Sequence, residues 1–283
     1  KNIYYFLISL LLMTAFACSA KSNKEIKNEP SLKGALKGKF YIGTALNVTQ
    51  IHGIDTASIN IVKNEFDAIV AENCMKSMFL QPKEGEFFFE DADKFVEFGE
   101  QNNLYITGHC LIWHSQAPSW FFVDNDGKDV SAEVLKQRMK AHITTVVSRY
   151  KGRIKGWDVV NEAIMEDGSY RKSKFYTILG EEFIPLAFQY AHEADPDAEL
   201  YYNDYNEWHK GKREAIINLI KSFKEKNIRI DAVGMQGHFG MDSPSLEEYQ
   251  ATIDDYTSTG VKVMVTELDL SALPSPRRNT GAN

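Results

Sequence analysis

The feature that most constrains the fold is a regular alternation of short apolar segments with longer amphipathic ones, from Phe40 almost to the end of the chain. Short apolar runs are typical of buried strands, and amphipathic runs are typical of helices that cover a sheet. An alternation repeated this often predicts β-α units around a parallel sheet. An eight-fold (β/α) barrel, the TIM barrel of the α/β class, explains the repeats better than a doubly wound sheet, which usually has fewer units.

The alternation predicts seven strands and six helices. The strands are expected at residues 40–46, 66–72, 104–111, 154–160, 199–204, 231–237 and 261–268. The helices are expected at residues 56–65, 91–102, 131–150, 174–193, 211–226 and 245–259. Residues 271–283 contain two prolines and no apolar run. We therefore expect the incomplete barrel 40–283 to lack its last helix–strand–helix portion, which exposes the edges of its first and seventh strands.

The N-terminal segment departs from this pattern. Lys1 precedes an apolar run over residues 3–17, which ends in Ala17 and Cys18. A basic start, a short apolar core and small residues predict an export signal over residues 1–18, because a spanning helix needs about 20 apolar residues. Cys18 resembles the lipid-attachment cysteine of bacterial lipoproteins, and ordinary signal-peptidase cleavage is the alternative. We expect an exported protein, either secreted or a lipoprotein of the outer membrane or cell surface, with a tether over residues 19–39.

Composition excludes one class of partner. The chain has 32 Lys and Arg against 39 Asp and Glu, a net charge of −7, whereas a nucleic-acid-binding protein needs a basic face. A neutral polymer is compatible with this charge. Cys74 and Cys110, the cysteines after Cys18, are expected to be two buried thiols. The protein is expected to act as a monomer.

Two carboxylates follow predicted strands at positions where a parallel barrel places its active site. Glu162 ends the fourth strand segment. Glu267 shares a strand face with Val263 and Val265, where a charge is costly unless it is paired or functional. Either glutamate alone is more commonly a helix cap or a surface residue. Together they provide what a glycosidase requires, an acid for the leaving group and a second carboxylate that attacks the anomeric carbon or activates water.

Histidines and other polar residues end the third and sixth strands. His109 and Trp113 are four residues apart, so they share a face and can line one pocket. His109 and His114 fall on opposite faces if the strand continues, which argues against a metal pair, and no cofactor is expected. Gln236 and His238 share a face that suits two groups aimed at one substrate. Each histidine alone is also compatible with a structural role.

Several motifs occur in one order along the chain. They are Gly108-His109 with Trp113-His114-Ser115-Gln116, then Trp157-Asp158-Val159-Val160-Asn161-Glu162-Ala163, Gln236-Gly237-His238 and Thr266-Glu267-Leu268-Asp269. These motifs closely resemble glycoside hydrolase family ten, the endo-β-1,4-xylanases with a (β/α)8 barrel. The similarity extends over residues 40–276, and the start of the chain and residues 77–82 look most like xylanases of gut-type anaerobic bacteria.

The resemblance implies a role for each matching residue. Glu162 would be the acid/base and Glu267 the nucleophile of a retaining mechanism. His238 would hydrogen-bond Glu267 and be held by Asp269, and Asn161 would contact the 2-hydroxyl of the −1 sugar. The other expected substrate contacts are Glu72, Asn73, Lys76, His109, Trp113 and Gln236 on the glycone side, and Tyr205 and Asn206 on the aglycone side.

The sequence departs from the family pattern at two places. Ser77 stands where many members have a Trp, and the eighth strand, whose loop carries Trp residues over the −1 sugar, is not expected from residues 271–283. The leading hypothesis is an exported endo-β-1,4-xylanase that acts on xylan or xylo-oligosaccharides. An endo-β-1,4-glucanase with the same barrel and a non-catalytic surface glycan-binding protein are the alternatives, because a fold does not fix a function.

Overall fold

The computed structural model describes residues 30–272. The predicted export signal, Cys18, most of the predicted tether and residues 273–283 lie outside this range. The chain divides into two compact units, Lys1–Ser31 and Leu32–Asn283. The architecture below is that of the second unit.

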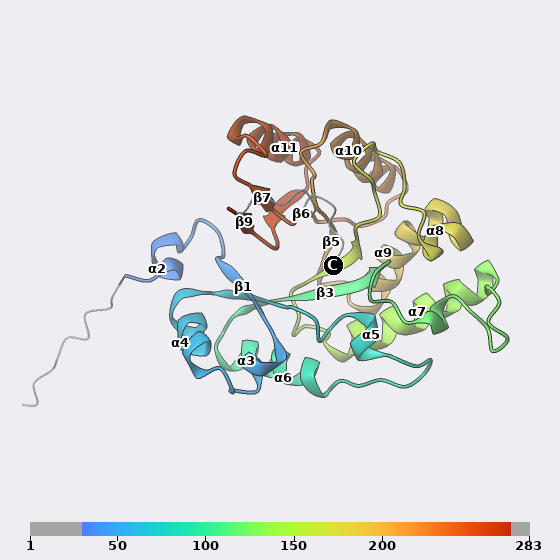
Figure 1. Ribbon diagram of the computed structural model, residues 1–283, viewed down its shortest axis with the longest axis horizontal. Coiled ribbons are helices and arrows are strands. Elements are labelled where there is room, and N and C mark those ends of the chain that lie inside the picture. Colours follow the sequence, from blue (N-terminus) through green and yellow to red (C-terminus); the bar gives the residue numbers. More distant parts are fainter. Residues whose placement is uncertain (1–29, 273–283) are drawn as a thin grey trace, which may run out of the picture. The chain divides into compact units, whose positions relative to one another are not determined.

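The centre of the unit is a curled parallel sheet (Figure 1). Its strands are β1 (Gly43–Leu46), β2 (Ala68–Ala71), β3 (Tyr105–Trp113), β4 (Gly156–Asn161), β5 (Glu199–Asp204), β6 (Ala232–Met235) and β8 (Lys262–Val265). Each strand pairs with the next one along the chain, and all the pairings are parallel. Strands that follow one another in this way form a barrel wall, so the predicted α/β barrel class and all seven predicted strands are confirmed.

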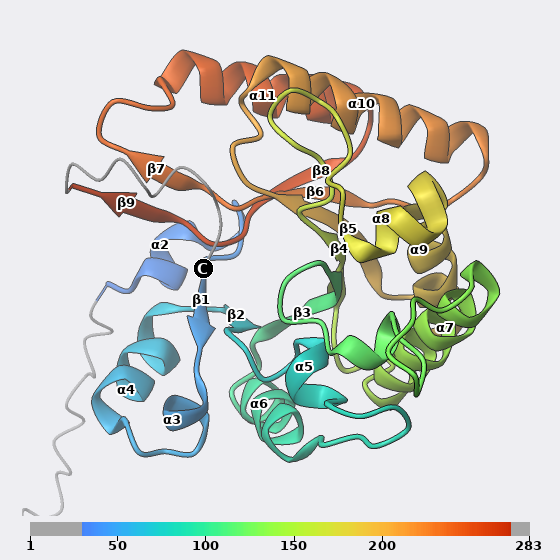
Figure 2. The ribbon, with the colours of Figure 1, turned by 45° about the vertical axis from the view of Figure 1, so that its right-hand side comes forward.

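Helices lie on the outer side of the curled sheet (Figure 2). The long ones are α4 (Thr56–Glu65), α6 (Glu90–Gln101), α7 (Ala132–Arg149), α9 (Phe183–Ala194), α10 (Lys210–Glu225) and α11 (Leu246–Ser258). Their starts follow from local chemistry, because side-chain oxygens of Asp55, Ser131 and Ser245 accept hydrogen bonds from the first-turn amides. Ser245 also forms a reciprocal capping box with Glu248.

Two predictions about helices need correction. The single helix predicted over residues 174–193 is broken into α8 (Lys174–Leu179), a 3-10 turn η2 (Gly180–Glu182) and α9. Gly180 ends α8 with a φ of +62°, a conformation that glycine adopts at little cost. The predicted tether overlaps a short helix, α2 (Leu32–Leu36), where the Leu32 amide donates to the Glu65 carboxylate over 2.7 Å.

Several short elements carry too little periodicity to be predicted. They are α3 (Val48–Ile51), α5 (Ser77–Leu80), the 3-10 turn η1 (Ser119–Phe121), and a separate two-stranded sheet of β7 (His238–Gly240) and β9 (Asp269–Ser271). Register within this small sheet places His238 opposite Asp269. This pairing brings together two segments that are 31 residues apart in the chain and places the His238 ring within 2.9 Å of the Asp269 carboxylate.

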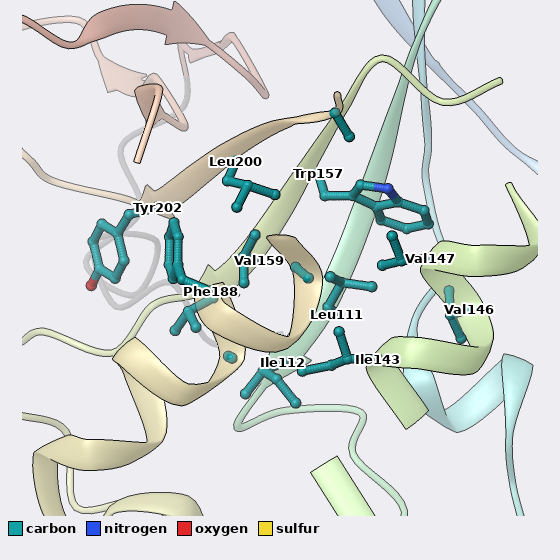
Figure 3. Packing of buried hydrophobic residues seen from close by; sticks show 14 of the residues in the cluster. Leu111, Ile112, Ile143, Val146, Val147, Trp157, Val159, Phe188, Leu200 and Tyr202 are labelled. Carbon is teal, nitrogen blue, oxygen red and sulfur yellow. The ribbon is translucent and has the colours of Figure 1, made fainter. Parts of the chain in front are cut away.

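The core follows the sheet and its covering helices, and Figure 3 shows the part of it between β3, β4 and β5 and the helices α7 and α9. Figure 3 shows Ile112 and Val159 of the sheet facing Ile143 of α7 and Phe188 of α9, and all four are buried. Burial of one such side chain stabilises the fold by about 1.5–3 kcal/mol. Cys74 and Cys110 are also buried and unbridged, as predicted.

Beyond β6 the packing is looser. Every residue of β4 is buried, whereas none of β8 is. In the described part of the chain β8 pairs only with β6, so one side of its backbone and much of its side-chain surface stay open. Within residues 30–272, no helix has both the length and the apolar character needed to cross a membrane.

Candidate active site

The carboxylate of Glu162 lies in a buried position directly after the last residue of β4. Its side chain accepts hydrogen bonds from the Trp113 indole over 2.9 Å and from the Gln236 amide over 3.0 Å. Asn161 contributes a longer contact of 3.3 Å. Three different strand ends therefore place neutral donors around one carboxylate.

Burial is the main influence on Glu162. It raises the pKa of this carboxyl above the ordinary 4.5, and the nearby charges of Asp204 and Glu267 act in the same direction. The hydrogen bonds from Gln236 and Trp113 lower the pKa and offset only part of that increase. A carboxyl with a raised pKa can carry a proton in the range where general acids operate.

Glu267 lies two residues beyond the end of β8 and has a different kind of support. His238 Nε2 is 3.3 Å from its carboxylate, and His238 Nδ1 is 2.9 Å from the carboxylate of Asp269. The hydrogen bond to Glu267, assisted by that to Asp269, raises the pKa of His238 to about 9 against the opposing effect of burial. The imidazolium therefore donates from both ring nitrogens at neutral pH.

The pKa of Glu267 is lowered although burial acts to raise it. The hydrogen bond from His238 and the positive charges of His109 and His238 outweigh that desolvation, and the Asn203 amide adds a further hydrogen bond of 3.0 Å. Glu267 is therefore ionised at a pH where Glu162 holds its proton more readily.

Asn203 of β5 connects the two carboxylates. Its amide donates to Asn161 over 2.9 Å as well as to Glu267, and Asn161 in turn contacts Glu162. Gly234 of β6 leaves the space for this side chain, because a Cβ there would lie 2.3 Å from the Asn203 oxygen. Asn203 is not among the residues predicted from the sequence, yet it occupies the centre of the constellation.

The predicted glycone-side residues form a connected group. Lys76 donates to the Asn73 side chain over 2.9 Å, and its ammonium lies 4.8 Å from the centre of the Trp113 ring. The Asn73 amide donates to Glu72 over 3.4 Å. His109 contacts the same Trp113 ring, with 6.4 Å between the ring centres, and its Nδ1 pairs with the buried carboxylate of Asp158 at 2.8 Å. Polar side chains and the Trp113 ring thus stand together beside Glu162.

The predicted aglycone-side residues, Tyr205 and Asn206, follow β5. Arg171 donates to the Tyr205 hydroxyl over 2.6 Å and to the main-chain carbonyl of Glu162 over 2.8 Å. The Asn206 amide donates to Glu166 over 3.2 Å. These contacts connect the end of β5 to the loop after Glu162.

Three expectations about strand faces need correction because the strands end at other residues than expected. β3 ends at Trp113, so His114 also turns toward Glu162, with Nε2 at 4.0 Å from its carboxylate. Burial, aided by the charge of Arg171, lowers the pKa of His114 to about 4, so this ring is neutral.

The other two corrections concern the sixth and seventh strands. β6 ends at Met235 and Gly237 has a φ of +77°, so Gln236 and His238 contact different carboxylates. β8 ends at Val265, which is 43% exposed, so Glu267 does not continue a packed face. Its proximity to the site comes from the turn after the strand.

Sequence reasoning also missed a buried polar group behind the site. It consists of Tyr202, Asp204, Glu207 and Lys212. The run Asn203-Asp204-Tyr205-Asn206-Glu207 ends a strand, so the rule that located Glu162 could have found most of it. One carboxylate oxygen of Glu207 accepts a hydrogen bond from the main-chain amide of Gln236 over 2.7 Å. The other oxygen has no hydrogen-bond partner among the described residues. Burial raises the pKa of Glu207 to about 8.

Across residues 30–272, no three His, Cys, Asp or Glu side chains are grouped as a metal would require. The described constellation consists of two carboxyl groups with opposite pKa shifts, joined by amides and surrounded by aromatic and polar side chains. Such a pair can act as acid and nucleophile in glycosidic bond cleavage.

Comparison with known proteins agrees with this geometry. The chain is 48% identical over 282 residues to endo-1,4-beta-xylanase A of Xylanibacter ruminicola, which covers all of this chain and 74% of that protein. It is 45% identical over 244 residues to an endo-1,4-beta-xylanase of Geobacillus stearothermophilus, which covers 86% of this chain and 72% of that one.

Solved structures give the same result. A GH10 endoxylanase from a sugarcane soil metagenome superposes with a TM-score of 0.85 at 45% identity, over 88% of this chain and 72% of that one. The sequence model of glycosyl hydrolase family 10 matches residues 31–282. With its strand order, its two strand-end glutamates and these matches, the chain belongs to glycosyl hydrolase family 10.

Proposed function

We propose that the protein hydrolyses internal β-1,4-xylosidic linkages of xylan with retention of anomeric configuration. The observation that carries the proposal is the opposite shift of two carboxyl pKa values, raised for Glu162 and lowered for Glu267. Environments that separate two pKa values in this way assign the acid and the nucleophile. The xylanase relatives supply the substrate class.

In the first step protonated Glu162 donates its proton to the glycosidic oxygen while ionised Glu267 attacks the anomeric carbon. The bond to the leaving sugar breaks and a glycosyl–Glu267 ester forms. In the second step Glu162, now a carboxylate, removes a proton from water, which attacks the anomeric carbon and releases Glu267. Two inversions give net retention, and this route requires the carboxyl groups to be about 5–5.5 Å apart.

The surrounding residues suit the binding of a sugar chain. We assign Asn161 to the 2-hydroxyl of the −1 sugar, because its side chain adjoins Glu162 and is held by Asn203. Glu72, Asn73, Lys76, His109, Trp113 and Gln236 are assigned to the glycone side, and Tyr205 and Asn206 to the aglycone side. His238 and Asp269 keep Glu267 ionised and oriented.

Reducing-sugar release from xylan and from carboxymethylcellulose tests the proposal, with Glu267→Ala as the inactive control. We expect release from xylan by the parent chain and none by the variant. NMR of the first-formed product should show the β-anomer before mutarotation. A preference for the glucan would reassign the substrate, and binding of xylan without turnover by a folded, monodisperse parent would favour a glycan-binding role.

We also propose that the protein is exported, with residues 1–18 as the signal and Cys18 as the site of lipid attachment. The proposal is supported by the basic start, the apolar run and the small residue before Cys18. Expression in a bacterial host with radiolabelled palmitate tests it, with Cys18→Ser as the control. Label in the parent and not in the variant is expected, whereas secretion of both without label would indicate ordinary signal-peptidase cleavage.

A further inference from the structure

The backbone of Glu162 has an unusual conformation. Its φ is +57°, and of the five described non-glycine residues with positive φ it is the only one that is not Asn or Gln. This left-handed region costs an L-residue roughly 1–2 kcal/mol, and Asn tolerates it best. The surrounding structure must therefore hold Glu162 in this conformation.

Each backbone group next to Glu162 has a specific partner. The Glu162 amide donates to the Asn203 carbonyl over 2.9 Å, as a continuation of the β4–β5 pairing. The Ala163 amide donates to the Tyr202 hydroxyl over 3.1 Å, and the Ile164 amide reaches Asp204 at 3.4 Å. The peptide after Glu162 is thus held by side chains rather than by a strand ladder, with Tyr202 of β5 on its amide and Arg171 on its carbonyl over 2.8 Å.

Those side chains belong to a buried chain of contacts that ends on α10. The Tyr202 hydroxyl donates to Asp204 over 2.5 Å, and the Lys212 ammonium donates to the other oxygen of Asp204 over 2.8 Å. Lys212 also donates to the Tyr205 carbonyl over 2.8 Å. All three side chains, Tyr202, Asp204 and Lys212, are fully buried.

The chain of contacts lies behind the site rather than in it. Tyr202 and Asp204 alternate with Asn203 along β5, so they point to the opposite face from the residue that contacts Glu267. A buried ion pair is by itself weak support for stability, because desolvation offsets the attraction between the charges. The Asp204–Lys212 pair is connected to the Ala163 amide through the Tyr202 hydroxyl, and this position gives the pair a more specific role.

We propose that Tyr202, Asp204 and Lys212 are positioning residues that fix the peptide after Glu162 and so aim its carboxyl at Trp113 and Gln236. The inference rests on the proposed function, in which Glu162 is the acid/base. The Tyr202 hydroxyl is the link, since it accepts from Ala163 and donates to Asp204. Lys212 donates to the other oxygen of Asp204 and so holds this carboxylate in place.

The test removes that one oxygen with Tyr202→Phe. Its matched control is Tyr201→Phe, which removes a hydroxyl from the adjacent residue of β5, where it donates to Glu199 over 2.8 Å away from the site. We expect Tyr202→Phe to lower kcat on xylan by roughly tenfold or more with little change in KM, because small displacements of a catalytic group are costly. Tyr201→Phe should keep the kcat of the parent.

Two NMR measurements do not depend on activity, so they separate this inference from the proposed function. In Tyr202→Phe the Ala163 amide should lose its hydrogen-exchange protection. The Glu162 carboxyl should titrate at higher pH than in the parent, because the hydrogen bonds that lower its pKa weaken. An inactive parent that still shows both changes would contradict the proposed function and support the positioning role.

The double variant Asp204→Asn with Lys212→Met removes both buried charges together and provides a second route if Tyr202→Phe does not fold. It should give the same two NMR changes and a similar loss of kcat. Variants that melt at lower temperature but keep the parent's kcat, Ala163 protection and Glu162 titration would overturn the proposal, because the network would then be structural only.

Discussion

The pKa values of the two carboxyls of the site are shifted in opposite directions by different physical causes. Glu162 is 4% exposed after a fully buried strand, and burial raises its pKa. Glu267 follows a strand that is partly open, and the bond and charge of His238 lower its pKa. Burial therefore sets the direction of the pKa shift of Glu162, whereas hydrogen bonds and charge set that of Glu267. The two halves should respond differently to mutation, pH and salt.

The largest expected effect is on the acid. Glu162→Gln keeps the shape of the side chain and cannot supply a proton, so kcat on xylan should fall about 10²–10⁴-fold. An aryl xyloside with a good leaving group needs no proton in the first step, so its first turnover should be much less affected. Equal losses on both substrates in burst kinetics would contradict the role of Glu162 as acid.

The difference in packing can be measured with two matched truncations. Leu200→Ala in β5 removes a fully buried side chain and should cost about 2–5 kcal/mol of unfolding free energy. Leu268→Ala removes a side chain that is 66% exposed beside Glu267 and should stay within about 0.5 kcal/mol of the parent. Urea denaturation measures both values, and similar costs would show that the two regions are packed alike.

The pKa of Glu207, which lies behind Glu162, is also raised mainly by burial, so this residue provides a test of burial in this half of the site. Its pKa is raised from 4.5 to about 8, so the folded chain binds more protons than the unfolded chain between these values. This contribution to stability is complete at low pH and is lost as the pH rises through that window. Glu207→Gln cannot ionise, so its stability relative to the parent should rise progressively between pH 4.5 and 8, by up to about 5 kcal/mol at the upper end.

Melting temperatures of both proteins across that pH range check the Glu207 prediction. Asp204 and Lys212 face this carboxyl from β5 and α10, and Tyr249 and Tyr256 face it from α11. These groups are the same in both proteins, so their contributions cancel in the comparison. Parallel curves for parent and variant would mean that Glu207 is ionised when folded.

The smallest effect is expected on the nucleophile side. His238→Asn keeps a polar group and removes the positive charge, so the pKa of Glu267 should rise. The acidic limb of kcat/KM should move to higher pH by about one unit. His52→Asn, which removes an exposed histidine paired with Asp91 at 2.7 Å, is the control and should leave the limb in place. If the acidic limb of the pH profile of His238→Asn coincides with that of the parent, the charge of His238 does not lower the pKa of Glu267.

Much of the fold could be predicted from the sequence because its elements repeat regularly. The strand 199–204 and the helix 56–65 match β5 and α4 at both ends. The break at Gly180 could not be predicted, since an isolated glycine in an amphipathic run also occurs inside helices. The β7–β9 pair could not be predicted either, because three-residue strands have no detectable period.

The site was predicted less completely than the fold. Glu162 and Glu267 were found because both follow apolar strands in a barrel whose active site lies at the strand ends. The position of His114 depends on where β3 ends, and one residue decides which face it occupies. The left-handed φ of Glu162 could not be predicted from the sequence, because the side chains that contact the adjoining peptide, such as Tyr202 of β5, are distant in the chain.

The central claim is that the pKa of Glu162 is raised and that of Glu267 is lowered, which assigns Glu162 as the acid and Glu267 as the nucleophile. Carbon-13 NMR titration of the two glutamate carboxyls, assigned with Glu162→Gln and Glu267→Gln, measures this directly. The account predicts that Glu162 titrates above 4.5 and Glu267 below 4.5. A reversed order, with Glu267 the last to lose its proton, would contradict it.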